Sequence, residues 1–241
     1  IDSNTCLLSM MMVNNETGYR LPVQTVFRVA KRKFPELITH CDAVQGFLKV
    51  PFQVRSLQAD LLSISGHKVH GVKGVGALYQ KNGIHLHPTF HGGSQERGLR
   101  PGTENVPAIA AFGAAVQTYG STVRERYQAV TEKKAYLLER LQELPNCKIH
   151  SVEDASPYII SFSLRPYRSE ILLHFLEKRE IFVSSGSACS KGKNSGVPVL
   201  FGATDAEADS ILRVSLSAET PNTALDALVS SLQEATKTLL Y

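Results

Sequence analysis

Short apolar runs alternate with helix-length segments through the first 80 residues, and this pattern constrains the fold more than any other feature. Four runs have the length of β-strands: residues 6–13, 37–41, 61–65 and 75–79. Residues 23–34 carry one apolar face at helical spacing, made by Val23, Val26, Phe27 and Ala30. Strands separated by helix-length connections predict a mostly parallel sheet of the α/β class. We expect residues 6–13 to form a strand that is buried on both faces.

The second half of the chain has a different pattern. Residues 84–104 are rich in Gly, His, Pro and Arg and predict a long functional loop, and residues 106–144 predict a helix broken near Gly120. The elements expected after it are a strand (158–164), a helix (169–179), a short strand (181–183), a strand (211–216) and a helix (223–240). This order predicts a small α+β unit. We therefore divide the chain into domains at residues 1–124 and 125–241.

Composition excludes several classes of function. The 26 basic and 22 acidic residues are mixed along the 241-residue chain, so no basic face for nucleic acid is predicted. No apolar run reaches the length that a membrane span needs, so we expect no membrane partner. The four cysteines are far apart and form no CxxC pair, which argues against a zinc knuckle or a disulfide scaffold and favours a reducing, cytoplasmic compartment. Two of them, Cys6 and Cys41, lie in apolar runs and are expected to be inert core residues.

Polar residues follow three of the predicted strands, where a ligand of an open α/β sheet binds. They are Asn15 after the first strand, Asp42 and Gln45 after the second, and Ser65, His67 and Lys68 after the third. Taken singly, such an Asp is more often a cap and such a Lys a surface residue. Together they suit one cofactor, because a lysine can form a Schiff base, an aspartate can keep a pyridine nitrogen protonated, and Ser and His can hold a phosphate. The set therefore predicts a pyridoxal phosphate site.

The glycine-rich sequence of residues 71–76 resembles a nucleotide-binding loop. Their order is GxxGxG rather than GxGxxG, and no GxxxxGK[ST] sequence occurs in the chain. We interpret them instead as residues that permit a tight turn after Lys68.

Five motifs in order resemble the class V aminotransferase family, and within it the cysteine desulfurases of the NifS/IscS type. They are NNETG (14–18), DAVQ (42–45), SGHK (65–68), GGSQERGLRPGT (92–103) and SSGSAC (184–189). The resemblance implies the fold type I of pyridoxal-phosphate-dependent transferases. Residues 1–124 would supply the C-terminal half of the large domain, and residues 125–241 the small domain.

The resemblance also implies a role for each matching residue. Lys68 would be the catalytic Schiff-base lysine, Asp42 the partner of the pyridine nitrogen, and Gln45 the partner of the phenolic oxygen. Ser65 and His67 would bind the phosphate, and Thr103 would reach the phosphate of the neighbouring subunit in a homodimer. Asn15 and Arg213 would lie at the substrate carboxylate.

Cys189 decides which reaction the resemblance implies. Its neighbours are Gly, Ser and Lys, which predict an exposed loop, and Lys191 and Lys193 favour the nucleophilic thiolate. The family reaction would convert L-cysteine to L-alanine and leave the sulfur on Cys189 as a persulfide. An iron–sulfur assembly scaffold or another sulfur carrier would then accept the sulfur.

The family pattern begins abruptly at Ile1. We expect the chain to start within the large domain, without the Gly-Ala-Thr-Glu phosphate loop and the ring-stacking histidine of the family. Two alternatives stay open: another class V enzyme, either a selenocysteine lyase or an aminotransferase, and a non-catalytic fragment that keeps only dimer or partner-binding surfaces.

Overall fold

The computed structural model describes residues 1–185 and 196–239, and its chain divides into two compact units. The first unit comprises Ile1–Met12 and Leu21–Val123, and the second comprises Val13–Arg20 and Arg124–Tyr241. The predicted domain boundary after residue 124 stays a prediction. The compact units divide one residue earlier, and they also place the short segment Val13–Arg20 with the second unit.

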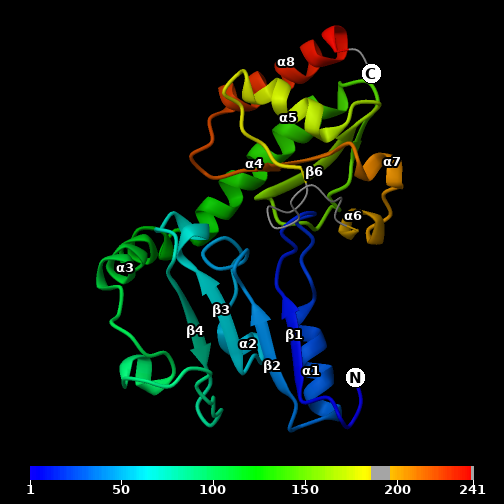
Figure 1. Ribbon diagram of the computed structural model, residues 1–241. Coiled ribbons are helices and arrows are strands. Elements are labelled where there is room, and N and C mark those ends of the chain that lie inside the picture. Colours follow the sequence, from blue (N-terminus) through cyan, green and yellow to red (C-terminus); the bar gives the residue numbers. More distant parts are fainter. Residues whose placement is uncertain (186–195, 240–241) are drawn as a thin grey trace. The chain divides into compact units, whose positions relative to one another are not determined.

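A four-stranded sheet forms the centre of the first unit (Figure 1). Its strands lie in the order β1 (Leu7–Met11), β2 (Ile38–Asp42), β3 (Leu61–Ser65) and β4 (Gly76–Gln80). The first three are parallel, and β4 is antiparallel to β3. The mostly parallel sheet confirms the predicted α/β class.

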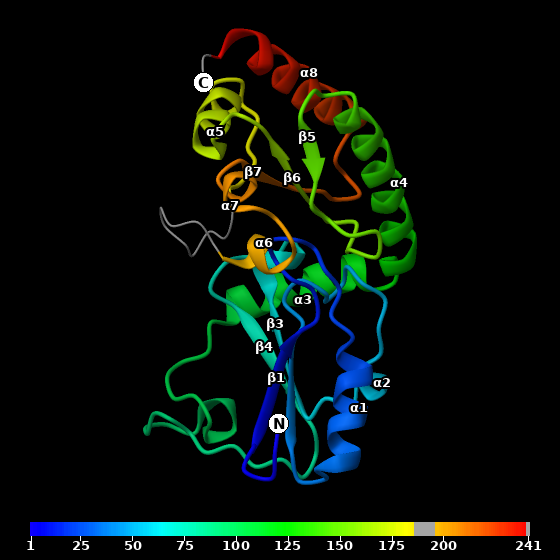
Figure 2. The same ribbon diagram turned by 90° about the vertical axis from the view of Figure 1, so that its right-hand side faces the viewer.

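Helices connect and cover this sheet. Helix α1 (Val23–Lys33) links β1 to β2 and buries Val23, Phe27 and Ala30, three of the four residues on its predicted apolar face. Figure 2 shows α1 and the short α2 (Val54–Leu57) along one face of the sheet. Helix α3 (Val106–Gly120) ends at the glycine where the sequence predicts a break. The next helix, α4 (Val123–Gln142), begins three residues later.

The prediction that the first strand is buried on both faces is wrong. Every second residue of β1 is exposed, including Leu7 at 49% and Met11 at 37%. The physical reason is its place in the sheet, since β1 lies at an edge and pairs only with β2 in the described part of the chain. Cys6, just before β1, is likewise exposed rather than in the core.

Cys41 behaves as predicted. It is fully buried in β2, and burial, assisted by the nearby charge of Asp42, raises the pKa of its thiol to about 12. The thiol is therefore neutral at physiological pH and has little nucleophilic character.

An antiparallel three-stranded sheet and its helices form the second unit. The strands are β5 (Cys147–Ile149), β6 (Ile159–Leu164) and β7 (Ile211–Ser215), with β6 in the centre and buried along its whole length. The other helices are α5 (Ser169–Glu177), α6 (Val197–Leu200), α7 (Asp205–Ala208) and α8 (Asn222–Thr238). Large apolar side chains fill the core between sheet and helices, among them Val130, Ile160, Phe162, Leu172 and Leu232.

The sequence predicted β6, β7, α5 and α8 but not every element of this unit. The expected strand at residues 181–183 is wrong, because in the described residues there only Ser184 forms a bridge, to Arg213. β5 was not predicted, since three residues with a lysine in the middle carry no periodic signal. Within the described ranges, no helix is long and apolar enough to cross a membrane, and no cluster of His, Cys, Asp and Glu could hold a metal ion.

A buried carboxylate joins the elements of the first unit. Asp60 is only 1% exposed and accepts hydrogen bonds of 3.0 Å from both the backbone N–H and the hydroxyl of Thr39 in β2. It also forms ion pairs with Lys31 of α1 and, at 3.4 Å, with Lys81 just after β4. Burial disfavours the charged carboxylate, but the Lys31 and Thr39 donors outweigh it, so the pKa of Asp60 lies below its ordinary value.

We predict that Asp60→Asn lowers the free energy of unfolding by about 3 kcal/mol at pH 7, because it removes one partner of a buried ion pair. A carboxyl group with a lowered folded pKa stabilises above its unfolded value of 3.8, and this contribution is lost as the pH falls through the folded pKa. The difference in the free energy of unfolding between variant and wild type, measured by urea denaturation, should therefore shrink below that pH.

Glu36→Gln, at an exposed position, is the control and should change stability by less than about 0.5 kcal/mol. Equal stability of Asp60→Asn and wild type at pH 7 would contradict the role given to Asp60.

Candidate functional site

Asp42 ends β2 and begins the turn that carries Gln45. One carboxylate oxygen of Asp42 accepts a 3.0 Å hydrogen bond from the backbone N–H of Val44, which is the capping role that such an aspartate commonly has. Its other oxygen has no hydrogen bond within the described residues. The side-chain oxygen of Gln45 accepts a 3.2 Å hydrogen bond from the Lys49 ammonium. The amide NH₂ of Gln45 donates no hydrogen bond within the described residues.

Ser65, His67 and Lys68 lie where β3 ends. A 3₁₀ turn, Gly66–Val69, follows β3 directly. The Ser65 hydroxyl lies 2.7 Å from Nδ1 of His67. Burial and then the charges of nearby lysines, Lys68 first, lower the pKa of His67, so the ring is neutral near pH 7 and has one N–H to donate.

The glycines after Lys68 serve close backbone approach. A Cβ atom at Gly71 would lie 2.9 Å from the carbonyl oxygen of Gly66, and one at Gly76 would lie 2.5 Å from that of Ile64. Gly74 adopts a positive φ of 82°. These contacts support the interpretation of residues 71–76 as a tight turn rather than a nucleotide loop.

Parallel pairing brings these two groups of side chains to the same end of the sheet. Asp42 pairs in register with Ser63, so Ser65 is only two residues further along the neighbouring strand. The charge of Lys68 acts on both Lys49 and His67 and lowers the pKa of each. The first unit therefore assembles an amine, a carboxylate, an amide, a hydroxyl and an imidazole at the carboxyl edge of β2 and β3.

This donor set fits pyridoxal phosphate. The unshared oxygen of Asp42 can accept from a pyridinium N–H, and the amide NH₂ of Gln45 can donate to a phenolic oxygen. The hydroxyl–imidazole pair of Ser65 and His67 can donate to a phosphate. Lys68 is half-buried beside them and can supply the amine.

Lys49 is a residue of this site that the sequence did not single out. It is half-buried, and desolvation, followed by repulsion from the Lys68 charge, lowers the pKa of its ammonium to about 8. Its spacing of four residues from Gln45 within a turn was the only signal available, and a lone lysine at such spacing belongs to no motif.

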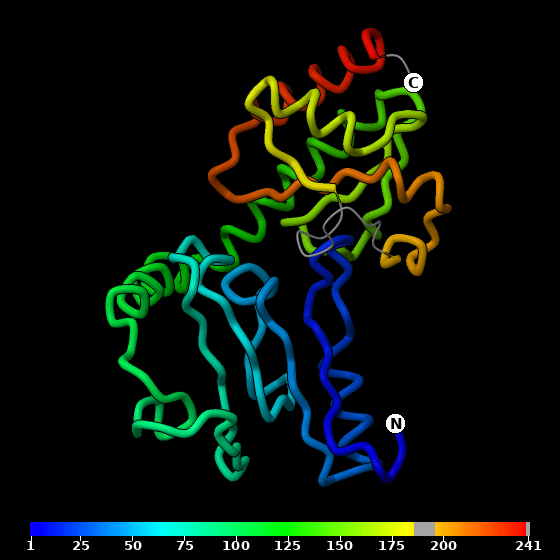
Figure 3. The backbone as a smooth tube through the Cα atoms, viewed as in Figure 1, coloured from blue at the N-terminus to red at the C-terminus, as the bar shows by residue number. Residues whose placement is uncertain are grey.

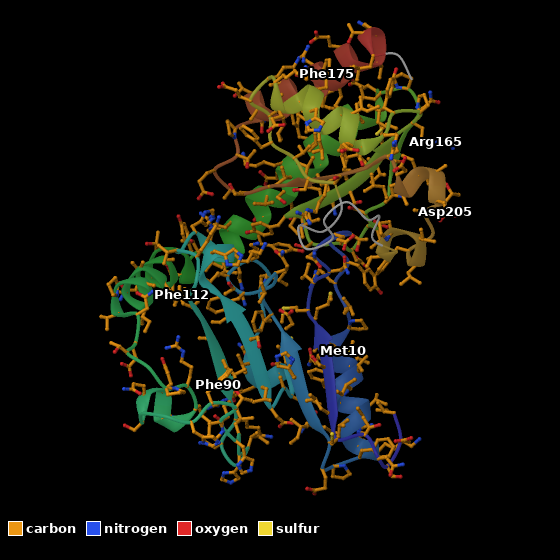
Figure 4. The ribbon with its side chains drawn as sticks, in the orientation of Figure 1. Met10, Phe90, Phe112, Arg165, Phe175 and Asp205 are labelled. Carbon is orange, nitrogen blue, oxygen red and sulfur yellow. The ribbon has the colours of Figure 1, made fainter. Side chains whose placement is uncertain are left out.

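Thr103 lies in the long loop between β4 and α3, which Figure 3 traces. A short 3₁₀ turn, Gln95–Gly98, interrupts this loop, and the Gln95 side chain accepts a 3.1 Å hydrogen bond from the backbone N–H of Gly102. Thr103 is exposed, as is Phe90, which is labelled in the same loop in Figure 4. The loop therefore presents a broad accessible surface.

Asn15 and Arg213 lie in the second unit, where the structure brings them together. The Arg213 guanidinium donates a 2.9 Å hydrogen bond to the backbone carbonyl of Asn15. Backbone bonds in both directions join Arg213 to Ser184, the bridge that stands in place of the predicted strand. Burial lowers the pKa of Arg213 and the charge of Glu16 raises it, with burial the larger influence.

The NNETG motif forms the turn that holds Asn15. The side-chain oxygen of Asn14 accepts 2.9 Å hydrogen bonds from the backbone N–H groups of Glu16 and Thr17. Gly18 has a positive φ of 76°, and a Cβ atom there would lie 3.0 Å from the carbonyl oxygen of Ile159 in β6. The turn is therefore fixed against the central strand of the second unit. Cys189, Lys191 and Lys193 lie outside the described residues.

Comparison with known proteins gives consistent matches. The family model for class-V aminotransferases matches residues 1–228. "Cysteine desulfurase IscS" of Clostridium botulinum strain Hall is 34% identical over 98% of this chain and 61% of its own length. "Cysteine desulfurase" of Trichormus azollae is 36% identical over 80% of this chain and 48% of its own length. The chain thus spans about half to three-fifths of these relatives.

Solved structures match as well. A protein described as "NIFS-LIKE PROTEIN" superimposes with a TM-score of 0.92 at 33% identity, over 99% of this chain and 63% of its own. A structure described as "SspA in complex with cysteine" gives a TM-score of 0.74 at 31% identity, over 92% and 61%. These similarities confirm the fold type expected from the sequence resemblance.

We predict that Lys49→Met changes the pH dependence of stability. The unfolded chain binds more protons at Lys49 than the folded chain between pH 8 and 10.5, so Lys49 makes wild-type stability rise with pH over this window. The free energy of unfolding of the variant minus that of wild type should therefore decrease by up to about 3 kcal/mol as the pH rises through this window. Urea denaturation of both proteins at a series of pH values measures this difference. Lys33→Met, at an exposed position of α1, should show no such trend, and an identical trend in both variants would contradict the burial of the Lys49 charge.

Proposed function

Because the chain belongs to the class-V aminotransferase family, we propose that the protein is a pyridoxal-phosphate-dependent cysteine desulfurase that converts L-cysteine to L-alanine. The observation that carries the proposal is the position of Lys68 beside Ser65 and His67, where β3 ends, next to the strand that ends in Asp42. The names of the relatives from Clostridium botulinum and Trichormus azollae support the choice of reaction.

The residues of the first unit would hold the cofactor and move one proton. When bound, pyridoxal phosphate supplies an electron sink for the bonds at the substrate Cα. Asp42 would keep the pyridine nitrogen protonated, Gln45 would donate to the phenolic oxygen, and Ser65 and His67 would hold the phosphate. Lys68 Nζ would anchor the cofactor and, when free, take the proton from Cα of the substrate.

The residues of the second unit would orient the substrate. The Arg213 guanidinium presents several donors, of which one is used by the Asn15 carbonyl, and the remaining donors suit a carboxylate. Asn15 would contact the same carboxylate. The hydrogen bond from Arg213 to Asn15 supports a shared role for these two residues.

Cys189 would receive the sulfur. Its thiolate, favoured by Lys191 and Lys193, would attack the substrate sulfur, so that an S–S bond forms while the substrate C–S bond breaks. The electron pair of the broken bond stays with the carbon skeleton, which gains a proton and becomes alanine. A cysteine persulfide remains on the protein for a sulfur acceptor, such as an iron–sulfur assembly scaffold.

The protein would act as a homodimer in a reducing compartment such as the cytoplasm. The exposure of Thr103 in its loop supports a contact with the phosphate of a neighbouring subunit. The exposed, unpaired Cys6 supports the reducing compartment.

We predict that Lys68→Ala abolishes covalent attachment of the cofactor. After incubation with pyridoxal phosphate and reduction with borohydride, mass spectrometry of wild type should find the added mass on the peptide that contains Lys68. Lys73→Ala, at an exposed position in the following turn, should keep the added mass on the Lys68 peptide. Labelling of a different lysine in wild type would reject the assignment of Lys68.

We predict that Cys189→Ser lowers sulfide release from L-cysteine in the presence of a thiol by about two orders of magnitude or more, because the nucleophile is removed. Cys6→Ser, which removes the exposed cysteine of the first unit, is the matched control and should keep the wild-type rate. Release at the wild-type rate by Cys189→Ser would reject the persulfide step, and exchange with a keto acid instead of sulfide release would indicate an aminotransferase.

A further inference from the structure

A cavity of about 280 Å³ lies within the second unit, apart from Arg213 and Asn15. Helix α4 forms one wall, the segment before β6 forms another, and Arg20 lies at its edge. The lining residues are Arg20, Tyr127, Thr131, Lys134, Ala135, Leu138, Glu153, Asp154, Ala155 and Pro157. One water occupies roughly 30 Å³ of liquid, so a cavity of this volume has room for an organic molecule of several heavy atoms.

Lys134 gives the cavity its chemistry. It is only 8% exposed, and its ammonium donates one hydrogen bond, of 3.2 Å, to the backbone carbonyl of Ala155. The other two ammonium protons have no acceptor in the described parts of the chain. Burial lowers the pKa of Lys134, whereas the charge of Asp154 raises it. A buried cation with one acceptor is costly, and an anionic group in the cavity would supply the missing acceptors.

The other charged residues of the lining show which kind of anion fits. Arg20 is exposed and donates a 3.3 Å hydrogen bond to the Tyr127 hydroxyl. Glu153 and Asp154 are exposed and form no ion pair in the described residues. The two cations and two carboxylates of the lining cancel, so a ligand that carries one charge of each sign matches better than a multiply charged anion.

Apolar side chains complete the lining. Ala135 and Leu138 lie one helical turn apart on α4, and Pro157 lies in the segment before β6. This patch can cover a short aliphatic side chain.

We propose that this cavity binds a free α-amino acid with a small aliphatic side chain. The carboxylate of the ligand lies at Lys134 and Arg20, its ammonium at Glu153 and Asp154, and its side chain against Ala135, Leu138 and Pro157. The site contains none of the residues assigned to the cofactor or to the reaction, so it does not depend on the proposed function.

Binding of L-valine to the cofactor-free chain tests the proposal. Calorimetry gives the dissociation constant, and the amide resonance of Ala155 in an NMR titration reports whether the ligand occupies this cavity. Lys134→Met keeps the apolar stem and removes the charge, so we expect it to weaken binding by about tenfold or more. Lys133→Met, the neighbouring lysine of α4, lies outside the lining and should bind as wild type does. Equal affinity of wild type and Lys134→Met, or no response of Ala155, would overturn the proposal.

Two further measurements keep the proposal falsifiable. Arg20→Gln changes an exposed residue at the edge of the cavity, and we expect it to weaken L-valine by roughly two- to fivefold without loss of folding, even where Lys134→Met does not fold. Acetate, methylamine and inorganic phosphate each carry one part of the required chemistry and should bind more weakly than L-valine. Binding of acetate or phosphate as tight as that of L-valine would overturn the assignment to a zwitterion.

Discussion

The buried carboxylate of Asp60 is the interaction on which the first unit depends. It lies between β2 and β3 in the chain and meets charged groups from α1 and from the end of β4. Desolvating a carboxylate is costly, and only the simultaneous presence of Lys31, Lys81 and Thr39 offsets that cost. Because these partners come from different elements, the carboxylate is satisfied only when the strands have their observed order and register. That register is what places Asp42 and Ser65 at one edge.

The site at that edge combines few carboxylates with several cations. The charges of Lys68, Lys73 and Lys49 all lower the pKa of His67. One carboxylate oxygen of Asp42 already accepts the hydrogen bond that caps its turn. A surplus of positive charge around backbone turns and a neutral imidazole suits a ligand with a doubly charged phosphate better than a neutral one. These cations also affect one another, because burial and the charge of Lys68 together lower the pKa of the Lys49 ammonium. The electrostatics of the site are therefore a property of the group rather than of any single residue.

Sequence predicted well what is local and poorly what depends on a partner. The helix over 23–34, the break at Gly120 and the strands that carry Asp42 and Lys68 follow from periodicity and turn chemistry, which act over a few residues. The exposure of Cys6 and β1 depends on which elements pack on an edge strand, and apolar composition does not report it. Residues 181–183 have strand-like composition, yet in the described part of this stretch only the neighbouring Ser184 forms a β-bridge. Lys49 and Lys134 matter through desolvation, which a sequence does not display.

The segment Val13–Arg20 is separated from the rest of its unit by more than a hundred residues, so the second unit is discontinuous in the chain. Protein chemists often isolate a domain by cutting once between two compact parts. A piece cut here between Val123 and Arg124 would contain Arg213 but would lose the Asn15 carbonyl that it contacts. The surface of β6 that Gly18 approaches would be uncovered, and Arg20 would be missing from the edge of the cavity. Two pieces divided at that point would each be incomplete, and mixing them would amount to a complementation experiment rather than a recombination of independent domains.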